Sequence, residues 1–517
     1  MLFRQRVECA IFVILVALSR YLCRSHYLYD LDSVNFALGI QRFDPVVHQP
    51  HPPGYFLYVY LARAVNLLFQ DANASLVALS IAASCGAVVV IYLLALQWFG
   101  PKAATFAGLI FLVSPITWFH GTVALIYIVE AFASALVGYL CWQVYCGRER
   151  FAVPVAVLLG ISAGVRPSFL LFLAPLFLFS LWKISRKRAS LAVAALGVAL
   201  LGWFIPMVEA SGGFRAYAAS FLALWHVAGG KETVMNSSPL TSLVRLFTIG
   251  LIYGLCFGSA ILLSGRAFRP STGAERSKKI FTLVWMTPGV LFFTFVFLLF
   301  VNSGYLLVVF PPVFAWLGLW ASDWYQHLES PRIMKVTIVA LLAAINILIF
   351  FEAPMYCSYQ SVRHFDAEIR DLQRSTGRIA SPERTLIVGF DSHFLGYRHA
   401  GYYLPAYATV EYPEVKQAAG PRVFAMHNRE THLAQQLEPS GFTQFLFFPL
   451  PSDDRAYAEY LDKVKAKFPK SDLHAVRSGT HTFIFGPISD LPILFPHAAP
   501  AALYTARHAP NESVYSR

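Results

Sequence analysis

Long apolar runs of about 16 to 24 residues alternate with short polar segments through the first 353 residues of the chain. Because roughly 20 apolar residues span a bilayer as a helix, this pattern predicts a polytopic α-helical membrane protein. A β-barrel would show short segments of alternating hydrophobicity instead. We expect about eleven transmembrane helices, at residues 8–24, 75–98, 104–119, 127–146, 151–165, 168–183, 189–207, 241–264, 280–301, 304–321 and 336–353.

A second domain is predicted to begin near residue 354, where the apolar runs shorten to strand length and charges become frequent. Strand-like patterns occupy 385–390, 442–448 and 482–485, and helical patterns occupy 361–373 and 456–467. We therefore expect a division into a transmembrane domain at 1–353 and a small α/β domain at 354–517. The tail from about residue 496 has weak periodicity and is predicted to be poorly ordered.

The composition identifies lipid as the main solvent of this chain. Hydrophobic residues make up 57% of it and charged residues 14%, whereas about a quarter of the residues in soluble domains are charged. The mean hydropathy is +0.54. The net charge of +12 comes from cations dispersed at the ends of apolar runs, which is typical of a topology signal and not of a nucleic-acid-binding surface.

The positive-inside rule decides the place of residues 54–70, which are apolar but carry Arg63 and Asn66. If this segment is an interfacial helix on the outer surface, every basic connection falls on the cytoplasmic side. If it spans the membrane, most of these connections move outside. We therefore expect an interfacial helix, a cytoplasmic N-terminus and a C-terminal domain on the outer side of the membrane. The basic connections are 99–103, 147–150, 184–188, 265–279 and 322–335.

Three further patterns exclude other classes of protein. Arg4 and Arg6 precede the first apolar run, but no small-x-small cleavage site follows it, so we expect an uncleaved first helix. The seven cysteines form no CxxC motif and lie mostly inside apolar runs, which argues against a disulfide framework or a cysteine metal site. No internal repeat is present, which disfavours carriers built from duplicated halves.

The first outer loop, residues 25–74, places carboxylates beside the membrane at Asp30 and Asp32. Ionisable groups are costly there unless they are well solvated or functional. Asp32 precedes a short helical pattern, Ser33–Arg42, and can be its N-cap. That interpretation explains one aspartate and leaves Asp30 without a role.

The same loop carries His48 and His51 in a Pro-rich stretch that ends at Pro53-Gly54. The prolines indicate a stiff, extended turn into the interfacial helix. An i, i+3 pair of histidines in such a turn is not a usual metal-ligand spacing.

Three residues outside this loop are further candidates for a functional site. Glu130 lies in an apolar run near the outer end of the fourth predicted helix and needs a partner, water or a task. Arg166 precedes Pro167 in an outer turn, where it can reach lipid phosphates or pair with the phosphate of a lipid-linked substrate. Tyr305 follows Gly304 in another outer turn and can equally be an interfacial belt residue. His120 is expected to be a solvated loop residue.

In order along the chain, these residues resemble the GT-C superfamily of membrane glycosyltransferases. The shared features are Asp-x-Asp-Ser-x-x-Phe-Ala from Asp30, His-Pro-Pro-Gly-Tyr from His51, an outer carboxylate, Arg-Pro and Gly-Tyr-Leu-Leu-x-x-x-Pro. The resemblance is especially to bacterial relatives of glycosyltransferase family 39, the protein O-mannosyltransferases, and of the lipid A aminoarabinose transferase. It implies a bacterial inner membrane, with the C-terminal domain in the periplasm. The resemblance covers about residues 1–353, and its motifs are short.

The resemblance implies a sugar donor linked to a polyprenyl phosphate and transfer on the outer face of the membrane. The family's first-loop aspartate falls on Asp32, its second-loop acidic residue on Glu130, and its phosphate-proximal cation on Arg166. Many relatives have Asp-Glu in the first loop where this chain has Asp32-Ser33. This departure argues against the family's metal-binding role at that position.

The residue types suit this chemistry. A carboxylate can take the proton of an acceptor hydroxyl as it attacks the anomeric carbon, and inversion needs one basic group on that face. We expect Asp32 as this base, with Arg166 stabilising the phosphate leaving group. Asp30 and Glu130 would position acceptor or metal. His48, His51 and Tyr305 would bind sugar or phosphate.

No cofactor is established by the sequence. If a divalent metal, Mg²⁺ or Mn²⁺, takes part, its expected ligands are Asp30, Asp32 and Glu130. The expected partners are the polyprenyl-phosphate sugar, membrane lipids and an acceptor protein, lipid or glycan.

Two other classes stay open at this point. A transporter or flippase of a lipid-linked sugar or anionic solute could use Glu130 and Arg166, although carriers bind near the bilayer midplane and these residues gather at the outer interface. A non-catalytic scaffold for polymer assembly would leave Asp32 without a task.

Overall fold

The computed structural model describes most of the chain. The described residues are 3–225, 238–257, 260, 273–296, 303–353, 357–379, 381–389, 395–411, 442–447, 454–478, 481–490 and 504–506. They form two compact units. The helical unit contains residues 1–25, 39–45 and 52–361, and the sheet unit contains residues 26–38, 46–51 and 362–517. The predicted first outer loop is therefore divided between the two units.

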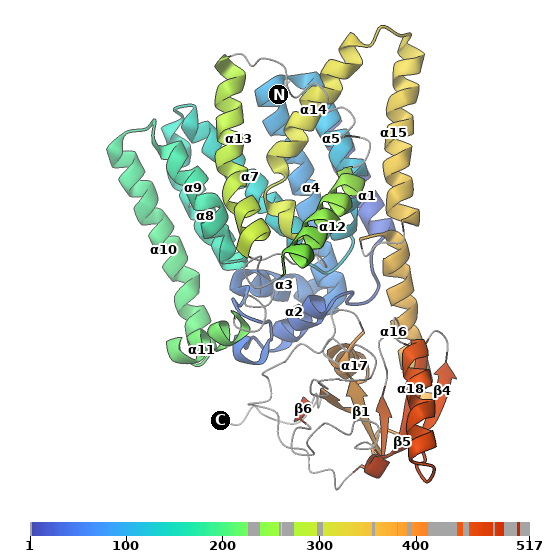
Figure 1. Cartoon of the computed structure of the whole chain (residues 1–517). Coiled ribbons are helices and arrows are strands. Elements are labelled where there is room, and N and C mark those ends of the chain that lie inside the picture. The colour runs from blue at the N-terminus through green and yellow to red at the C-terminus, as the bar shows by residue number, and fades with distance from the viewer. Residues whose placement is uncertain are drawn as a thin grey trace. The chain divides into compact units, whose positions relative to one another are not determined.

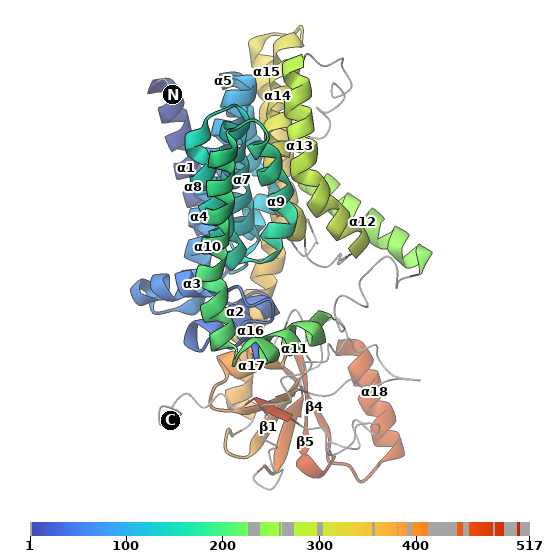
Figure 2. The same ribbon diagram turned by 90° about the vertical axis from the view of Figure 1, so that its left-hand side faces the viewer.

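The helical unit is a bundle built around long apolar helices (Figures 1 and 2). Among the described residues, five helices are long and apolar enough to cross a membrane: Ala72–Phe99, Tyr127–Tyr145, Arg186–Ala210, Glu275–Val296 and Arg332–Glu352. A mostly helical membrane architecture is thus confirmed, and the count of about eleven spans stays a prediction.

The helices of this unit follow the apolar runs of the sequence. Their bounds are α1 Phe3–Leu22, α3 Phe56–Phe69, α4 Ala72–Phe99, α5 Pro101–Val113, α6 Pro115–His120, α7 Tyr127–Tyr145, α8 Ala152–Val165, α9 Ser168–Leu181, α10 Arg186–Ala210, α11 Phe214–Leu224, α12 Pro239–Phe257, α13 Gly273–Leu291, α14 Pro311–His327 and α15 Arg332–Glu352. Short helical turns lie at η1 Pro45–Val47, η2 Glu149–Phe151, η5 Phe292–Val296 and η6 Tyr305–Val308.

Proline sets two helix starts that the hydropathy pattern did not predict. The predicted span 104–119 divides at Ser114 into α5 and α6, because Pro115 is favoured at the first position of a helix. The predicted span 304–321 begins with the short turn η6, and α14 starts only at Pro311 and continues to His327. The predicted spans 241–264 and 280–301 lie partly outside the described residues.

The described parts of the predicted basic connections lie at one end of the bundle (Figure 1). Lys102 at the start of α5 donates to Gln326 Oε1 near the end of α14, at 3.2 Å. Lys278 of α13 donates to the carbonyl of Trp98 near the end of α4. The backbone N–H of Ser185 before α10 donates to Glu149 Oε1 at 2.8 Å. Figure 1 shows the N-terminus and the α14–α15 connection at this end, where we expect the cytoplasmic face.

Helix α3 and helix α11 run across the opposite end of the bundle (Figures 1 and 2). At 14 residues, α3 is shorter than the roughly 20 needed to span a bilayer, and it exposes Leu67 and Leu68 at 80% and 81%. Arg63 donates to the carbonyls of Gly39 and Ile40, both at 2.9 Å. Asn66 accepts from Ser75 Oγ at 3.0 Å, so both polar residues of this helix have structural partners.

Arg20 shows how a cation is accommodated inside the bundle. Its residue is fully buried, and its guanidinium donates to the carbonyls of Leu112 at 2.8 Å and Phe111 at 3.4 Å. These carbonyls lie at the end of α5, where helical carbonyls lack partners within the helix. The guanidinium also lies 5.0 Å from the ring centroid of Trp118. Arg20 therefore joins α1 to the break between α5 and α6.

The sheet unit contains a six-stranded sheet with strand order β4-β5-β3-β1-β2-β6. Strands β2, β1 and β3 are parallel to one another, and β4, β5 and β6 pair antiparallel. The strands are β1 Thr385–Gly389, β2 Ala408–Glu411, β3 Gln444–Phe447, β4 His474–Ser478, β5 His481–Pro487 and β6 Tyr504–Ala506. The helices are α16 Tyr359–Ile379, α17 Tyr397–Tyr403 and α18 Asp454–Lys467, with the turn η10 Ile488–Asp490.

The sequence patterns located three of these strands and two helices. The predicted strands at 385–390, 442–448 and 482–485 coincide with β1, β3 and β5, although β3 begins only at Gln444, after Phe442 and Thr443. Phe390 and Phe448 are outside the described residues. The predicted helices at 361–373 and 456–467 lie in α16 and α18. The tail that was predicted to be disordered contributes β6, which pairs with β2. The rest of that tail lies outside the described residues.

Candidate functional site

Helix α2, Leu31–Gln41, starts in the sheet unit and separates the roles of the two first-loop aspartates. The backbone N–H of Asp32 donates to Asp30 Oδ1 at 2.9 Å, and the N–H of Val34 donates to the Asp30 carbonyl at 3.2 Å. Asp30 therefore supplies the N-terminal cap, which satisfies an N–H that the helix cannot bond itself. The expectation that Asp32 is the cap of a helix at 33–42 is wrong, because the helix begins at Leu31.

The carboxylate of Asp32 faces His51 instead. Asp32 Oδ1 lies 3.3 Å from His51 Nδ1, and the two side chains are 20% and 17% exposed. Asp30 is only 1% exposed. The sequence placed both aspartates and both histidines in one loop, and the fold brings one member of each pair together. The Asp32–His51 pair keeps an open side through which a polar molecule can reach the carboxylate.

The segment that carries His48 and His51 has little regular structure. It starts with the turn η1, and His48 has a φ of 58°, in the left-handed region that residues other than glycine seldom adopt. The peptide bonds before Pro50 and Pro53 are cis. The rings of His48 and His51 have centroids 6.4 Å apart. Both histidines therefore line the same short turn.

His48 is held as a neutral side chain. Burial lowers its pKa well below the usual value, and the nearby charges of Arg398 and His51 lower it further, although part of the residue remains exposed. Because imidazole is neutral above its pKa, His48 can offer one donor and one acceptor at neutral pH. This suits a sugar hydroxyl better than a phosphate.

Two contacts anchor the start of this loop within the sheet unit. His26 Nδ1 lies 3.0 Å from Asp366 Oδ2 on α16, and the His26 N–H donates to the same carboxylate at 3.2 Å. The N–H of Leu28 donates to the hydroxyl of Tyr403 on α17 at 2.7 Å. The residues before α2 are thus bound to helices far away in the sequence. His26 and Asp366, for example, are 340 positions apart.

A second cluster lies in the helical unit, around Glu130 and Arg166. Arg166 Nη1 donates to Glu130 Oε1 at 2.6 Å, and the side chains are 12% and 1% exposed. Glu130 lies in the first turn of α7, and Arg166 is the residue at which α8 ends. Each charge therefore has the opposite charge as its partner, which is the arrangement that makes burial of an ion tolerable.

Three tyrosines surround the Arg166 guanidinium. Its centre lies 5.9 Å from the ring centroid of Tyr55, 5.8 Å from that of Tyr127 and 5.2 Å from that of Tyr305. Aromatic faces attract cations, most strongly where water is excluded. A Cβ at Gly304 would lie 2.2 Å from the ring of Tyr127, so glycine is required where η6 approaches α7. The sequence pointed to Tyr305 and missed Tyr55 and Tyr127, which resemble ordinary interfacial aromatics.

His120 was expected to be a solvated loop residue, and this is wrong. It is fully buried, and its Nε2 lies 3.1 Å from Ser303 Oγ. Its ring centroid is 5.2 Å from that of Tyr127. His120 therefore packs against Tyr127 of the Arg166 cluster and supports the position of that ring.

The seven predicted site residues fall into two clusters, one in each unit. Asp30, Asp32, His48 and His51 belong to the sheet unit, and Glu130, Arg166 and Tyr305 belong to the helical unit. Sequence reasoning missed Asn35 and Arg398, which contact each other in the sheet unit. No local pattern marks an arginine so distant from α2 as a partner of that helix.

The described residues contain no group of three or more His, Cys, Asp or Glu side chains arranged to hold a metal ion. The Asp30 carboxylate is already engaged by the N–H of Asp32. That Asp30, Asp32 and Glu130 bind a metal ion therefore stays a prediction.

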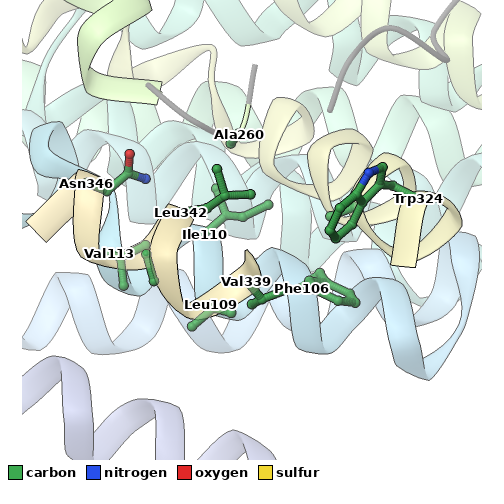
Figure 3. Close-up of a pocket in the computed structure, with 11 residues that line it drawn as sticks. Phe106, Leu109, Ile110, Val113, Ala260, Trp324, Val339, Leu342 and Asn346 are labelled. Atoms are coloured by element: carbon green, nitrogen blue, oxygen red, sulfur yellow. The ribbon is translucent and has the colours of Figure 1, made fainter. Parts of the chain in front are cut away.

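A separate pocket lies between α5, α14 and α15 (Figure 3). Apolar residues line it, among them Phe106, Ile110 and Leu342, with Asn346 and Trp324 as members that carry polar atoms. No residue of either cluster contributes to the lining. A pocket with this apolar lining suits a hydrocarbon chain and not a sugar.

Comparisons with known proteins agree with the resemblance drawn from the motifs. A family model described as the protein O-mannosyl-transferase TMEM260 N-terminal domain matches residues 46–190. The solved structure of ArnT from Cupriavidus metallidurans bound to undecaprenyl phosphate is 15% identical, with a TM-score of 0.58 over 92% of this chain and 97% of that one. The same protein in the apo state is 14% identical, with a TM-score of 0.55 over 96% and 98%. A search of curated proteins finds no match.

These likenesses confirm the resemblance to GT-C membrane glycosyltransferases. At such low identity, the structural match shows the fold, and it extends over nearly the whole of both chains. The sequence motifs suggested a resemblance over residues 1–353 alone. The likeness therefore reaches into the C-terminal segment, where no motif had pointed to it.

Proposed function

We propose that this protein is an inverting glycosyltransferase that moves a sugar from a polyprenyl-phosphate donor to an acceptor hydroxyl on the outer face of the membrane. The observation that carries this proposal is that Asp30 and Asp32 have different structural roles. Because Asp30 caps α2, the Asp32 carboxylate remains available beside His51, on the partly exposed side of its loop. The fold shared with ArnT, solved with undecaprenyl phosphate, supports the donor class.

In the proposed reaction, the acceptor oxygen bonds to the anomeric carbon as the bond from that carbon to the donor phosphate breaks. Asp32 takes the proton of the acceptor hydroxyl, and the polyprenyl phosphate leaves with the bonding electrons. General-base catalysis of this kind contributes about 10²- to 10⁴-fold. His51, whose Nδ1 lies 3.3 Å from Asp32 Oδ1, fixes the direction of the carboxylate, while His48 binds a sugar hydroxyl.

Arg166 is proposed to stabilise the departing phosphate. A guanidinium has five N–H donors, and Glu130 takes one of them. The remaining donors can bind phosphate oxygens, and the leaving group then needs no general acid. Glu130 holds the guanidinium in place, and Tyr305 covers one side of it and can also meet the sugar.

The test of this proposal is transfer by membranes supplied with a polyprenyl-phosphate sugar. Asp32→Asn is expected to lower kcat by about 10²- to 10⁴-fold at unchanged protein abundance. Asp44→Asn is the matched control, because Asp44 lies in the same loop and pairs with Arg42, whose side chain is 70% exposed. Full activity of Asp32→Asn would overturn the assignment of the base.

The same assay separates an enzyme from a flippase. Transfer releases free polyprenyl phosphate and leaves the sugar on a new acceptor. A flippase delivers the intact lipid-linked sugar to the other leaflet. Recovery of intact donor alone, with no glycosylated product, would favour the flippase.

Membrane orientation is proposed with the N-terminus in the cytoplasm and α3 at the outer interface. A cysteine at the exposed position Leu68 is expected to react with a membrane-impermeant thiol reagent added outside intact cells. The matched position is Lys102, in a basic connection at the other end of the bundle, which should react only after permeabilisation. Reaction of the Leu68→Cys protein only after permeabilisation would reverse the orientation.

A further inference from the structure

Arg398 joins two separate parts of the predicted active-site loop. Arg398 lies on α17 and is only 3% exposed. Its Nη1 donates to Asn35 Oδ1 at 2.6 Å. The same nitrogen donates to the His48 carbonyl at 3.2 Å, and Nη2 donates to the Val47 carbonyl at 3.3 Å. One buried side chain thus contacts both α2 and the turn that follows it.

These contacts lie beside the residues assigned to catalysis. Asn35 follows Asp32 by three positions on α2, so the two side chains lie on the same face of the helix. His48 precedes His51 by three positions in the turn. The distance of 3.3 Å between Asp32 and His51 therefore depends on how α2 is placed against residues 46–51.

The turn has little regular backbone pairing to fix its position, since the described backbone of residues 44–51 shows bridges only at Asp44 and Gln49. Its described backbone contains the three-residue η1 and the left-handed His48, with a φ of 58°. A conformation of this kind persists only where surrounding contacts impose it. The planar fork of an arginine can bond several acceptors at fixed directions, which a lysine ammonium cannot reproduce.

We infer that Arg398 is a positioning residue, through which the sheet unit holds α2 and residues 46–51 in the arrangement that directs the Asp32 carboxylate. This gives the C-terminal segment a task in transfer, since it supplies the side chain that organises the loop. The inference rests on the proposed function for the reaction it serves. The contact itself can be tested without any activity.

The first experiment measures amide hydrogen exchange by mass spectrometry in the full-length protein. Arg398→Gln is expected to raise exchange in residues 31–51 by at least about tenfold, with the peptides of α16 and β1 unchanged. Asn35→Ala removes the same contact from the side of α2 and should give the same pattern. Arg370→Gln is the matched control, because Arg370 is exposed on α16 and donates to the carbonyl of Asp366 in its own helix.

Arg398→Lys keeps a buried positive charge and guards against failure of the glutamine variant to fold. It is expected to raise exchange in residues 31–51 less than Arg398→Gln does, because one ammonium cannot reach all three acceptors in the original geometry. Wild-type exchange in both Asn35→Ala and Arg398→Lys would overturn the inference. An equal rise throughout the sheet unit would also overturn it, since that pattern reports general destabilisation.

The second experiment is a double-mutant cycle on transfer. Arg398→Gln is expected to lower kcat by about tenfold, with a smaller change in the donor KM, and Arg398→Lys should recover part of the loss. Combined with His51→Phe, it should cause little further loss, because both changes misdirect the same carboxylate. Fully additive losses would overturn the inference. If the wild-type protein transfers no sugar, the proposed function fails, while the exchange experiment still decides the role of Arg398.

Discussion

The Glu130–Arg166 pair and the Asp32–His51 pair each bring an acidic side chain against a basic one, but their surroundings are very different. The first has an N–O distance of 2.6 Å and side chains 1% and 12% exposed. The second has a distance of 3.3 Å and side chains 20% and 17% exposed. A tight, desolvated pair is costly to break and holds its geometry, whereas a looser pair near solvent can exchange a partner for a substrate. The first pair is therefore a fixed electrostatic element, and the second contains the carboxylate that we propose to react.

The largest expected effect comes from breaking the buried pair. Glu130→Gln removes the negative charge and leaves the Arg166 cation buried, so we expect a loss of about 3–5 kcal/mol in the free energy of unfolding. Thermal unfolding in detergent measures this loss. Asp32→Asn is the comparison, because its site is partly exposed and should change stability by no more than about 0.5 kcal/mol. Equal losses in the two variants would remove the distinction between the pairs.

Arg166→Lys tests whether the buried pair also binds substrate. Lysine can keep the contact to Glu130 but lacks the fork that binds a second anion, so we expect the donor KM to rise by about tenfold. The measurement is initial-rate kinetics at varied concentrations of the polyprenyl-phosphate sugar. A normal donor KM with lower stability would assign Arg166 a structural role alone.

His51→Phe tests the exposed pair in the same way. Phenylalanine removes the imidazole that lies 3.3 Å from the Asp32 carboxylate. A polar contact to a charged group is worth about 1.5–3 kcal/mol, so kcat should fall by about 10- to 100-fold while the unfolding temperature stays unchanged. His51→Asn keeps a donor near the Nδ1 position and should retain more activity. A large fall in the unfolding temperature of both variants would show that this pair is structural as well.

The smallest expected effect is that of Tyr305→Phe. The ring that lies 5.2 Å from the Arg166 guanidinium remains, and only the hydroxyl is lost, so activity should stay within about threefold of wild type. Tyr305→Leu removes the ring and should raise the donor KM further than Tyr305→Phe does. A severe loss in Tyr305→Phe would show that the hydroxyl itself contacts the substrate.

Local sequence patterns predicted much of the fold because they depend on near neighbours. The long apolar runs located α4, α7, α10 and α15, and strand-length runs located β1, β3 and β5. The predictions failed where one residue overrides the run, as when Pro115 starts α6 inside a predicted span. They also failed at the start of α2, where the pattern favoured Asp32 as the cap and the structure uses Asp30.

The candidate site was predicted residue by residue but not pair by pair. Residue type and position identified Glu130 and Arg166, since charged groups in apolar surroundings need partners. Their mutual contact spans 36 positions, which no periodicity encodes. Arg398 gave no signal at all, because an arginine among the charged residues of the C-terminal segment is ordinary. Its contact to Asn35 spans 363 positions.

The sequence by itself determined a polytopic helical membrane protein, its resemblance to a glycosyltransferase superfamily and the acidic and basic residues worth testing. Those features follow from the length of apolar runs and from the cost of placing charges beside lipid, both of which act locally. Only the tertiary structure decided that Asp30 caps α2, that Asp32 meets His51 and that residues 26–38 and 46–51 fold with the C-terminal segment. Such partnerships depend on which distant segments pack together, and short-range patterns carry no record of that.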